Sequence, residues 1–235
     1  PPRSTLFPYT TLFRSVAPRH RPQYPGVQWA RSLAICGDSV VVLDQVAADR
    51  PVRLDWFTYL PQEVLRGEEG APAPHWAPAA GFAEEGHGYA AFLNPEGVSA
   101  GALPHRVLYR LGKGDAPVGH LALLAPEGTG LLRMHGFIHW HPKQVPVYAM
   151  RRRDSRESWF AAVYTGLETA ARAGDVRCER IAVERDGVDV PPTTALALRV
   201  TNLAGTFLVL TSEHAGRHRF DGVDLDGPIM AVKRN

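Results

Sequence analysis

Apolar and polar residues alternate along most of this chain, and turn residues interrupt the alternation at short intervals. Short runs that are rich in Val, Leu, Tyr and Phe and are bounded by Gly, Pro, Asn or Asp are typical of β-strands. The runs with this pattern cover residues 29–35, 40–46, 52–60, 88–93, 106–111, 120–124, 131–138, 145–152, 159–165, 176–185, 195–201, 206–211 and 229–233. The pattern therefore predicts roughly a dozen short strands.

Helical periodicity is nearly absent, since only residues 166–173 favour a short turn of helix. Residues 36–38 and 48–51 carry turn residues that separate the first three predicted strands. Asp186-Gly187 and Asp221-Gly222 are typical of tight hairpin turns. Many short strands with regular turns indicate an all-β sandwich or barrel. We predict a two-sheet antiparallel β-sandwich.

One long segment, residues 61–87, departs from the alternation and is rich in Gly, Pro, Ala and Glu. A long stretch without secondary structure inside a compact domain is usually functional or disordered. The strand pattern resumes on both sides of it. We therefore expect an exposed loop insertion within a single β-sandwich domain that spans residues 16–235.

The first fifteen residues need a separate interpretation. An apolar edge strand could be formed by Leu6, Phe7, Tyr9, Leu12 and Phe13. The stretch TLFPYTTLFRS also matches the in-frame translation of a common short-read sequencing adapter at every position. Non-native segments are excluded from fold reasoning. We therefore expect residues 1–15 to be adapter-derived, the open reading frame to begin near Val16, and the natural start to be missing.

Composition narrows the class of protein without identifying it. The chain is 45% hydrophobic and 21% charged, which is typical of a globular protein with a substantial core. The net charge of +2 is too small to indicate a nucleic-acid partner, and no apolar run is long enough to span a membrane. Cys36 and Cys178 both lie in alternating apolar segments, so we expect buried free thiols.

A histidine cluster in RMHGFIHWHP is the first candidate site. His139 and His141 would lie on one face of a strand, close to His135, as in metal sites of the cupin type. The remaining ligands would have to come from Glu127, His120 or His214. The alternative is a set of half-exposed histidines beside the aromatic Trp140.

An arginine cluster in RRRDSRES is the second candidate. The cluster comprises Arg151, Arg152, Arg153 and Arg156, interleaved with Asp154 and Glu157. Arginine forks bind carboxylate and sulfate groups in a bidentate manner, so the cluster could bind an acidic polymer together with Trp140. The alternative is a charged hairpin tip in which the two acids neutralise the arginines. No nucleophile elbow or phosphate-binding loop is present.

The segment YPGVQWARSLAICGDSVVVLDQVAADRPVRLDWFTYL carries a family resemblance, together with the later PVYAMRRRDSRESWFAAVYTGLE. The order of a Tyr-Pro-Gly lead, an arginine strand, a Gly-Asp turn and an Asp-Trp strand resembles the C-terminal β-sandwich of the heparinase II/III-like polysaccharide lyases. That family includes many alginate lyases. The resemblance covers residues 24–235, mainly as a strand pattern.

The resemblance implies a parent enzyme that cleaves uronic-acid polysaccharides, such as alginate, heparin or heparan sulfate, by β-elimination. It places the catalytic tyrosine and one histidine in an N-terminal α/α toroid. It also places a His-x-His-x-Asp segment upstream of this chain, with a catalytic histidine and a ligand for zinc or calcium. We therefore expect no catalytic residue in this chain, and a periplasmic or secreted parent protein.

Three residues of the resemblance are expected to be structural: Arg31, Asp55 and Trp56. Family members often carry histidine where this chain has Val52 and Tyr59, so we expect Asp55 to pair with an arginine such as Arg31 and not to face a site.

Two other functions stay open. One is a carbohydrate-binding sandwich whose exposed aromatic residues stack on sugar rings. The aromatic candidates are Trp56, Trp76 and Trp140. The other is the cupin-like metal site.

Overall fold

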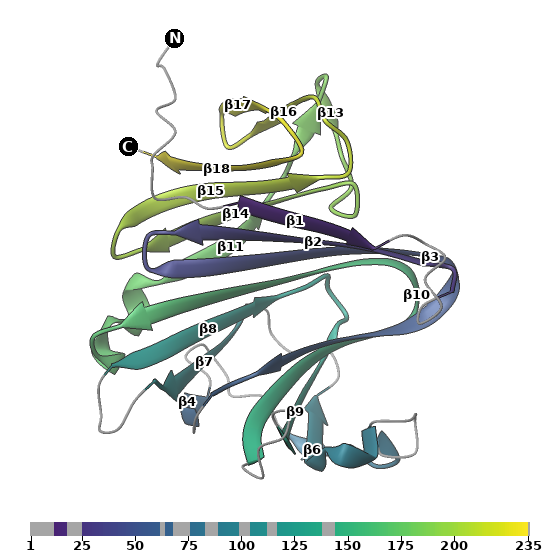
Figure 1. Ribbon diagram of the computed structural model, residues 1–235, viewed down its shortest axis with the longest axis vertical. Coiled ribbons are helices and arrows are strands. Elements are labelled where there is room, and N and C mark those ends of the chain that lie inside the picture. Colours follow the sequence, from purple (N-terminus) through teal and green to yellow (C-terminus); the bar gives the residue numbers. More distant parts are fainter. Residues whose placement is uncertain are drawn as a thin grey trace.

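Antiparallel strands make up most of the computed structural model, which describes residues 12–17, 25–61, 64–67, 76–82, 89–98, 104–111, 117–137 and 144–234. The described strands form three sheets (Figure 1). The first has the order β1–β2–β3–β10–β8–β7–β4, and β9, β6 and β5 extend it from one half of β10. Its strands are β1 (Leu12–Ala17), β2 (Val27–Cys36), β3 (Ser39–Tyr59), β4 (Val64–Gly67), β5 (Ala77–Pro78), β6 (Leu93–Val98), β7 (His105–Arg110), β8 (Val118–Leu124), β9 (Gly130–Phe137) and β10 (Gln144–Leu167).

The C-terminal part of the chain supplies the other two sheets. The second sheet contains β11 (Arg177–Ile181), β14 (Ala195–Asn202), β15 (Gly205–Ser212) and β18 (Ile229–Arg234). The third contains β13 (Val188–Asp189), β12 (Glu184–Arg185), β16 (Arg217–Phe220) and β17 (Val223–Asp226). Two short 3₁₀ helices, η2 (Tyr89–Ala91) and η3 (Ala170–Asp175), complete the described elements. The predicted all-β antiparallel sandwich is confirmed, with a small third sheet added to it.

Strands β3 and β10 are long, and they bend together at one side of the molecule (Figure 1). Their register runs from Ser39 to Ala47 and resumes at Val52, so that residues 48–51 of β3 lie opposite only Arg156 of β10. Such an irregularity bends a ladder and increases its twist. Pro51 is tolerated there because it has no β10 partner to which it would donate an N–H.

This bend corrects two sequence predictions. Residues 48–51 do not form a turn between two strands, because β3 runs through them. Residues 151–157 do not form a charged hairpin tip, because β10 is one continuous strand from Gln144 to Leu167. The polar residues in both stretches mark the place where the sheet folds over, since its backbone pairing is interrupted there.

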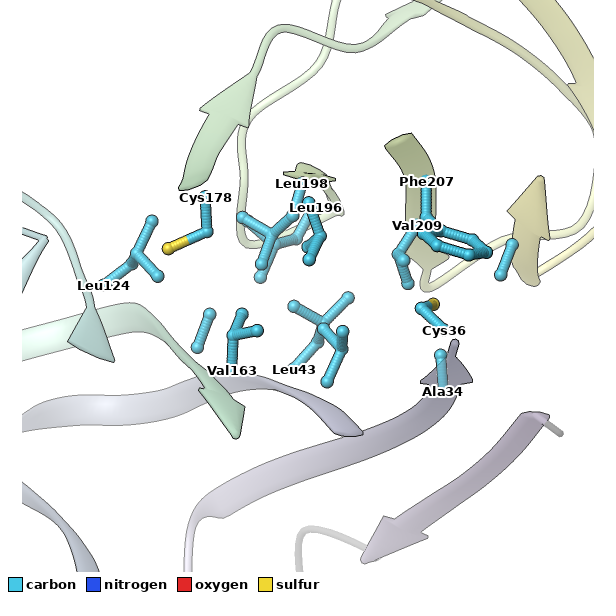
Figure 2. Close-up of a cluster of buried hydrophobic side chains, with 14 of the residues drawn as sticks. Ala34, Cys36, Leu43, Leu124, Val163, Cys178, Leu196, Leu198, Phe207 and Val209 are labelled. Carbon is cyan, nitrogen blue, oxygen red and sulfur yellow. The ribbon is translucent and has the colours of Figure 1, made fainter. Parts of the chain in front are cut away.

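Buried side chains fill the space on both faces of the first and second sheets. The second sheet packs on one face of the first through Leu43, Val163, Leu196, Leu198 and Val209. Figure 2 shows these side chains pointing toward one another from the two sheets. A separate cluster fills the inside of the folded first sheet, and a third lies between the second and third sheets. Successive side chains in a strand enter opposite layers, so a strand covered on both faces, such as β8, is buried at every position.

Both cysteines belong to the core between the first and second sheets, and they appear at opposite ends of it in Figure 2. Both are free thiols, as predicted, with 0% of Cys36 and 4% of Cys178 exposed. Burial raises the pKa of each thiol to about 12, so both are neutral near pH 7. Two buried, protonated thiols are inert packing groups.

Gly119 in β8 is required by close packing, because the ring of Tyr109 on β7 lies directly over it. A Cβ at this position would lie 2.5 Å from Cε2 and 2.6 Å from Cε1 of Tyr109. We expect Gly119→Ala to lower the free energy of unfolding by about 1–3 kcal/mol, as other overpacked cores do. Gly166→Ala is the matched control, since Gly166 pairs with Gly119 but a Cβ there meets no atom within 4 Å. Urea unfolding that gives equal losses for the two variants would contradict this account.

The predicted loop insertion at residues 61–87 contributes to the fold where it is described. It supplies β4 and β5, and the side chain of Phe82 is only 1% exposed in a cluster with Leu132 and Val147. Residues 62–63, 68–75 and 83–87 lie outside the described residues. The described parts thus combine exposed positions, such as Ala77 and Ala80, with Phe82, Val64 and Trp76, which contribute to the apolar clusters on the folded first sheet.

Residues 1–11 lie outside the described residues, and residues 12–17 form the edge strand β1, which pairs with β2. The strand interpretation of this part of the predicted adapter segment thus corresponds to backbone pairing at the sheet edge. No helix among the described residues is long and apolar enough to cross a membrane.

Candidate functional site

A groove of about 460 Å³ opens at the bend of the first sheet. Arg151, Arg152 and Arg153 line it from β10. Small residues line much of the remainder: Ala77, Ala79 and Ala80 in and after β5, Gly97 in β6, and Gly128 and Gly130 around the turn before β9. The groove thus combines three guanidinium groups with largely apolar walls, and it brings together the three arginines that the sequence indicated as substrate-binding.

Three consecutive residues of a regular strand could not all line one groove, because alternate side chains point to opposite faces. The β10–β3 register shifts between Arg152 and Ser155 and again between Ser155 and Glu157. Asp154 has a φ of 50°, in the left-handed region that asparagine and aspartate tolerate better than most residues. The backbone thus becomes irregular directly after Arg152, where Arg153 joins the lining of the groove.

Arg151 is neutralised by an aspartate within the fold. Its Nε and Nη2 donate to the two carboxylate oxygens of Asp55 at 2.7 and 3.0 Å. The side chains are 7% and 4% exposed, and the Tyr89 hydroxyl also donates to Asp55. Burial, followed by the hydrogen bond to Asp55, raises the pKa of Tyr89. The Arg151 guanidinium also lies over the ring of Phe82, with Cζ 5.0 Å from the centroid.

Arg152 is positioned by the turn between β8 and β9. Its Nη1 donates to the backbone carbonyl of Glu127 at 2.6 Å. The turn is closed by Thr129, whose Oγ1 donates to the carbonyl of Pro126 at 2.6 Å. The Nε of Arg152 is buried and has no hydrogen-bond partner among the described residues. Arg153, the third of the series, is exposed.

Asp44 forms a second polar cluster inside the folded sheet. It is fully buried and accepts from Arg31 Nη2 at 2.7 Å, from Arg31 Nε at 2.8 Å and from Trp29 Nε1 at 3.1 Å. The indole of Trp56 donates to the same carboxylate. The Arg31 guanidinium lies over the Trp29 ring at 4.8 Å. These groups satisfy one another, so the cluster is structural.

The expected pairing of Arg31 with Asp55 is therefore wrong. Arg31 lies directly opposite Asp44 in the β2–β3 register, and Asp55 lies directly opposite Arg151 in the β3–β10 register. Arg31, Asp55 and Trp56 each make buried or half-buried polar contacts, but in two separate clusters. Trp56 is 8% exposed and so offers no face on which a sugar could stack.

A third cluster surrounds Trp76, which is partly buried. The Arg133 guanidinium lies over its ring at 4.6 Å, and His105 meets the ring edge-on at a centroid distance of 5.8 Å. Burial, and to a lesser extent Arg133, lowers the pKa of His105 to about 4. His105 is therefore neutral near pH 7. Of this cluster, the sequence indicated only Trp76, as a possible surface for a sugar ring, because the other members come from separate strands.

The predicted metal site is described only in part. His135 is exposed on β9, whereas His139, His141 and Trp140 lie outside the described residues. Of the suggested additional ligands, His120 is buried in β8 and His214 is exposed after β15. Within the described ranges, no group of three or more His, Cys, Asp or Glu side chains could hold a metal ion. The cupin-like metal site therefore stays a prediction, because two of its three histidines lie outside the described residues.

Comparisons with known proteins agree with the fold. No protein-family model matches the chain, and neither does any curated protein sequence. Among solved structures, heparan sulfate lyase HepC from Pedobacter heparinus matches with a TM-score of 0.53 and 13% identity, over 91% of this chain and 28% of that one. A heparinase III gene product with methylated lysines matches with a TM-score of 0.51 and 10% identity, over 96% and 26% of the two chains. A further heparinase III structure matches with a TM-score of 0.50 and 7% identity, again over 96% and 26%.

These identities are low, so the matches establish similarity of fold. The matched fold is the one that the resemblance in the sequence implies, and the matches do not bear on the adapter interpretation of residues 5–15. The chain spans about a quarter of the length of these structures. Its all-β sandwich resembles part of heparinase III and of a heparan sulfate lyase.

Proposed function

We propose that this chain is the C-terminal β-sandwich region of a heparinase II/III-like polysaccharide lyase, and that it contributes binding of an acidic polysaccharide to the parent enzyme. The observation that carries the proposal is the fold similarity to heparinase III and heparan sulfate lyase structures over 91–96% of this chain. The arginine-lined groove supports it, because guanidinium forks suit sulfate and carboxylate groups.

The proposed reaction is β-elimination at a uronic acid. A base removes the proton from C5, the carboxylate beside that carbon is neutralised, and an acid protonates the leaving glycosidic oxygen. We place the base and the acid in the parts of the parent protein that the resemblance assigns to catalysis, which lie outside this chain. The β-sandwich alone is therefore proposed to bind the polymer and not to cleave it.

Separate measurements of polymer binding and polymer cleavage test the proposal that the β-sandwich binds without cleaving. We expect the purified chain to be retained on immobilised heparin at low ionic strength and released by salt, because contacts between arginine and anions are screened. We expect no retention on dextran, which is neutral. Incubation with heparan sulfate and with alginate is expected to produce no ultraviolet absorbance from an unsaturated uronate. A folded chain that is retained neither on heparin nor, in the same assay, on heparan sulfate or alginate would contradict the proposal.

A non-catalytic carbohydrate-binding sandwich is the second candidate, and the same groove favours it. The genomic sequence around the gene distinguishes the two functions. A helical toroid followed by a His-x-His-x-Asp segment supports the lyase, whereas an unrelated upstream domain supports the binding module.

A further inference from the structure

We propose that the groove at the sheet bend binds a single anionic group, a sulfate or a carboxylate, of an acidic sugar, and that Arg152 is its specificity-determining residue. This inference rests on the proposed function and assigns a site and a ligand class to it. The three consecutive arginines have the same chemistry, but the fold gives them different roles.

Arg151 is held as a wall of the groove. Two of its nitrogens are bonded to the Asp55 carboxylate, its side chain is 7% exposed, and its guanidinium lies over the Phe82 ring. The carboxylate, which Arg151 shares with Arg53 at 3.2 Å, occupies these donors and offsets part of the charge of Arg151 within the fold. The contribution of Arg151 to an incoming anion is therefore small.

Arg152 is held by a neutral acceptor. The Glu127 carbonyl fixes Nη1 at 2.6 Å without cancelling the charge, and no salt bridge from Arg152 to a carboxylate is present in the described part of the chain. The side chain is also half-buried, so its position is restricted before a ligand arrives. A pre-positioned cation binds an anion more tightly because less side-chain entropy is lost.

The remainder of the groove suits a sugar ring. Ala77 and Ala80 are exposed along one wall, and Gly97 and Gly130 contribute no side chain to the other. A volume of about 460 Å³ lies within the usual range of small-molecule sites. The apolar CH faces of a pyranose can pack on such walls while an acidic substituent reaches Arg152.

Isothermal titration with a heparin tetrasaccharide tests the assignment. We expect Arg152→Ser to weaken binding about tenfold, which corresponds to ~1.4 kcal/mol. Arg156→Ser is the matched control, because Arg156 is exposed on the same strand, loses the same charge and does not line the groove. Its affinity should stay within about twofold of the original chain. Ala80→Trp, a change at an exposed position, should fill the groove and weaken binding about as much as Arg152→Ser.

Comparing the sulfated tetrasaccharide with its desulfated form identifies which anionic group Arg152 binds. A desulfated tetrasaccharide that loses the Arg152-dependent affinity assigns a sulfate, and one that keeps it assigns a carboxylate. Equal losses of affinity for Arg152→Ser and Arg156→Ser would overturn the inference, since they would indicate that the net charge of the protein alone attracts the ligand. Unchanged binding by Ala80→Trp would overturn it as well. Absence of binding by the unmodified, folded chain to any acidic sugar would instead remove the proposed function itself.

Discussion

Replacing Asp55 with alanine is expected to lower the free energy of unfolding by about 3–5 kcal/mol, the usual cost of leaving one partner of a buried ion pair unpaired. Asp55 and Arg151 are 4% and 7% exposed, and the truncation leaves the guanidinium buried without its carboxylate. The Tyr89 hydroxyl and the Arg53 guanidinium, whose Nε lies 3.2 Å from Asp55, lose a partner at the same time. Urea unfolding followed by circular dichroism measures the change.

A second variant separates the unpaired charge from other effects. Combining Asp55→Ala with Arg151→Met also removes the guanidinium that would be left without its carboxylate. Apolar side chains often replace a buried ion pair at little cost in stability. We expect the double variant to be more stable than Asp55→Ala alone. Asp189→Ala, at an exposed position in β13, should be close to neutral. An Asp55→Ala protein that melts normally but no longer binds heparin would show that Asp55 serves binding and not the fold.

Replacing Asp44 with alanine is expected to lower the free energy of unfolding by about 3 kcal/mol, at the lower end of the range for a broken buried pair. Asp44 is fully buried, but its partner Arg31 is 35% exposed and can be solvated when the carboxylate is lost. The indole N–H groups of Trp29 and Trp56 lose their acceptor at the same time. The stability curve in guanidinium chloride provides the measurement.

The cluster around Asp44 also connects the two halves of the folded sheet. Asp44 precedes the bend in β3 and Trp56 follows it, so the hydrogen bond between them spans the bend. Trp56→Phe, which keeps an aromatic ring but removes the N–H and the five-membered ring, should cost about 2–4 kcal/mol from the lost hydrogen bond and the space left behind. Asp38→Ala, in the exposed turn before β3, serves as the control and should be nearly neutral. Comparable losses for Asp38→Ala and Asp44→Ala would refute a special role for the cluster.

Local sequence was sufficient for much of the strand pattern. The strand-forming runs bounded by turn residues place β7, β8, β9, β14, β15 and β18 within two residues of their predicted bounds. Asp186 and Gly187, and likewise Asp221 and Gly222, have positive φ values of 51–77°, as the predicted hairpins require. The Gly37-Asp38 turn also implies a register in which Arg31 faces Asp44, a signal that could have corrected the Asp55 assignment.

Local sequence could not predict the groove, because the segments that form it meet only in the tertiary structure. Arg151 and Asp55 are 96 residues apart, and pairing at that distance leaves no local pattern in either segment. The polar stretches at residues 48–51 and 151–157 indicated turns, because polar residues and proline usually end strands. In the fold these stretches lie side by side at the bend of two continuous strands.

The sequence by itself thus determined the all-β class, the hairpin turns and the buried thiols, since each follows from the contacts of neighbouring residues or of adjacent strands. Only the tertiary structure decided which arginine of the series 151–153 is neutralised and which is free of a carboxylate partner among the described residues. The physical reason is that the charge balance of a side chain is set by strands that meet it across the sheet. The residues beside it in the chain do not determine that balance.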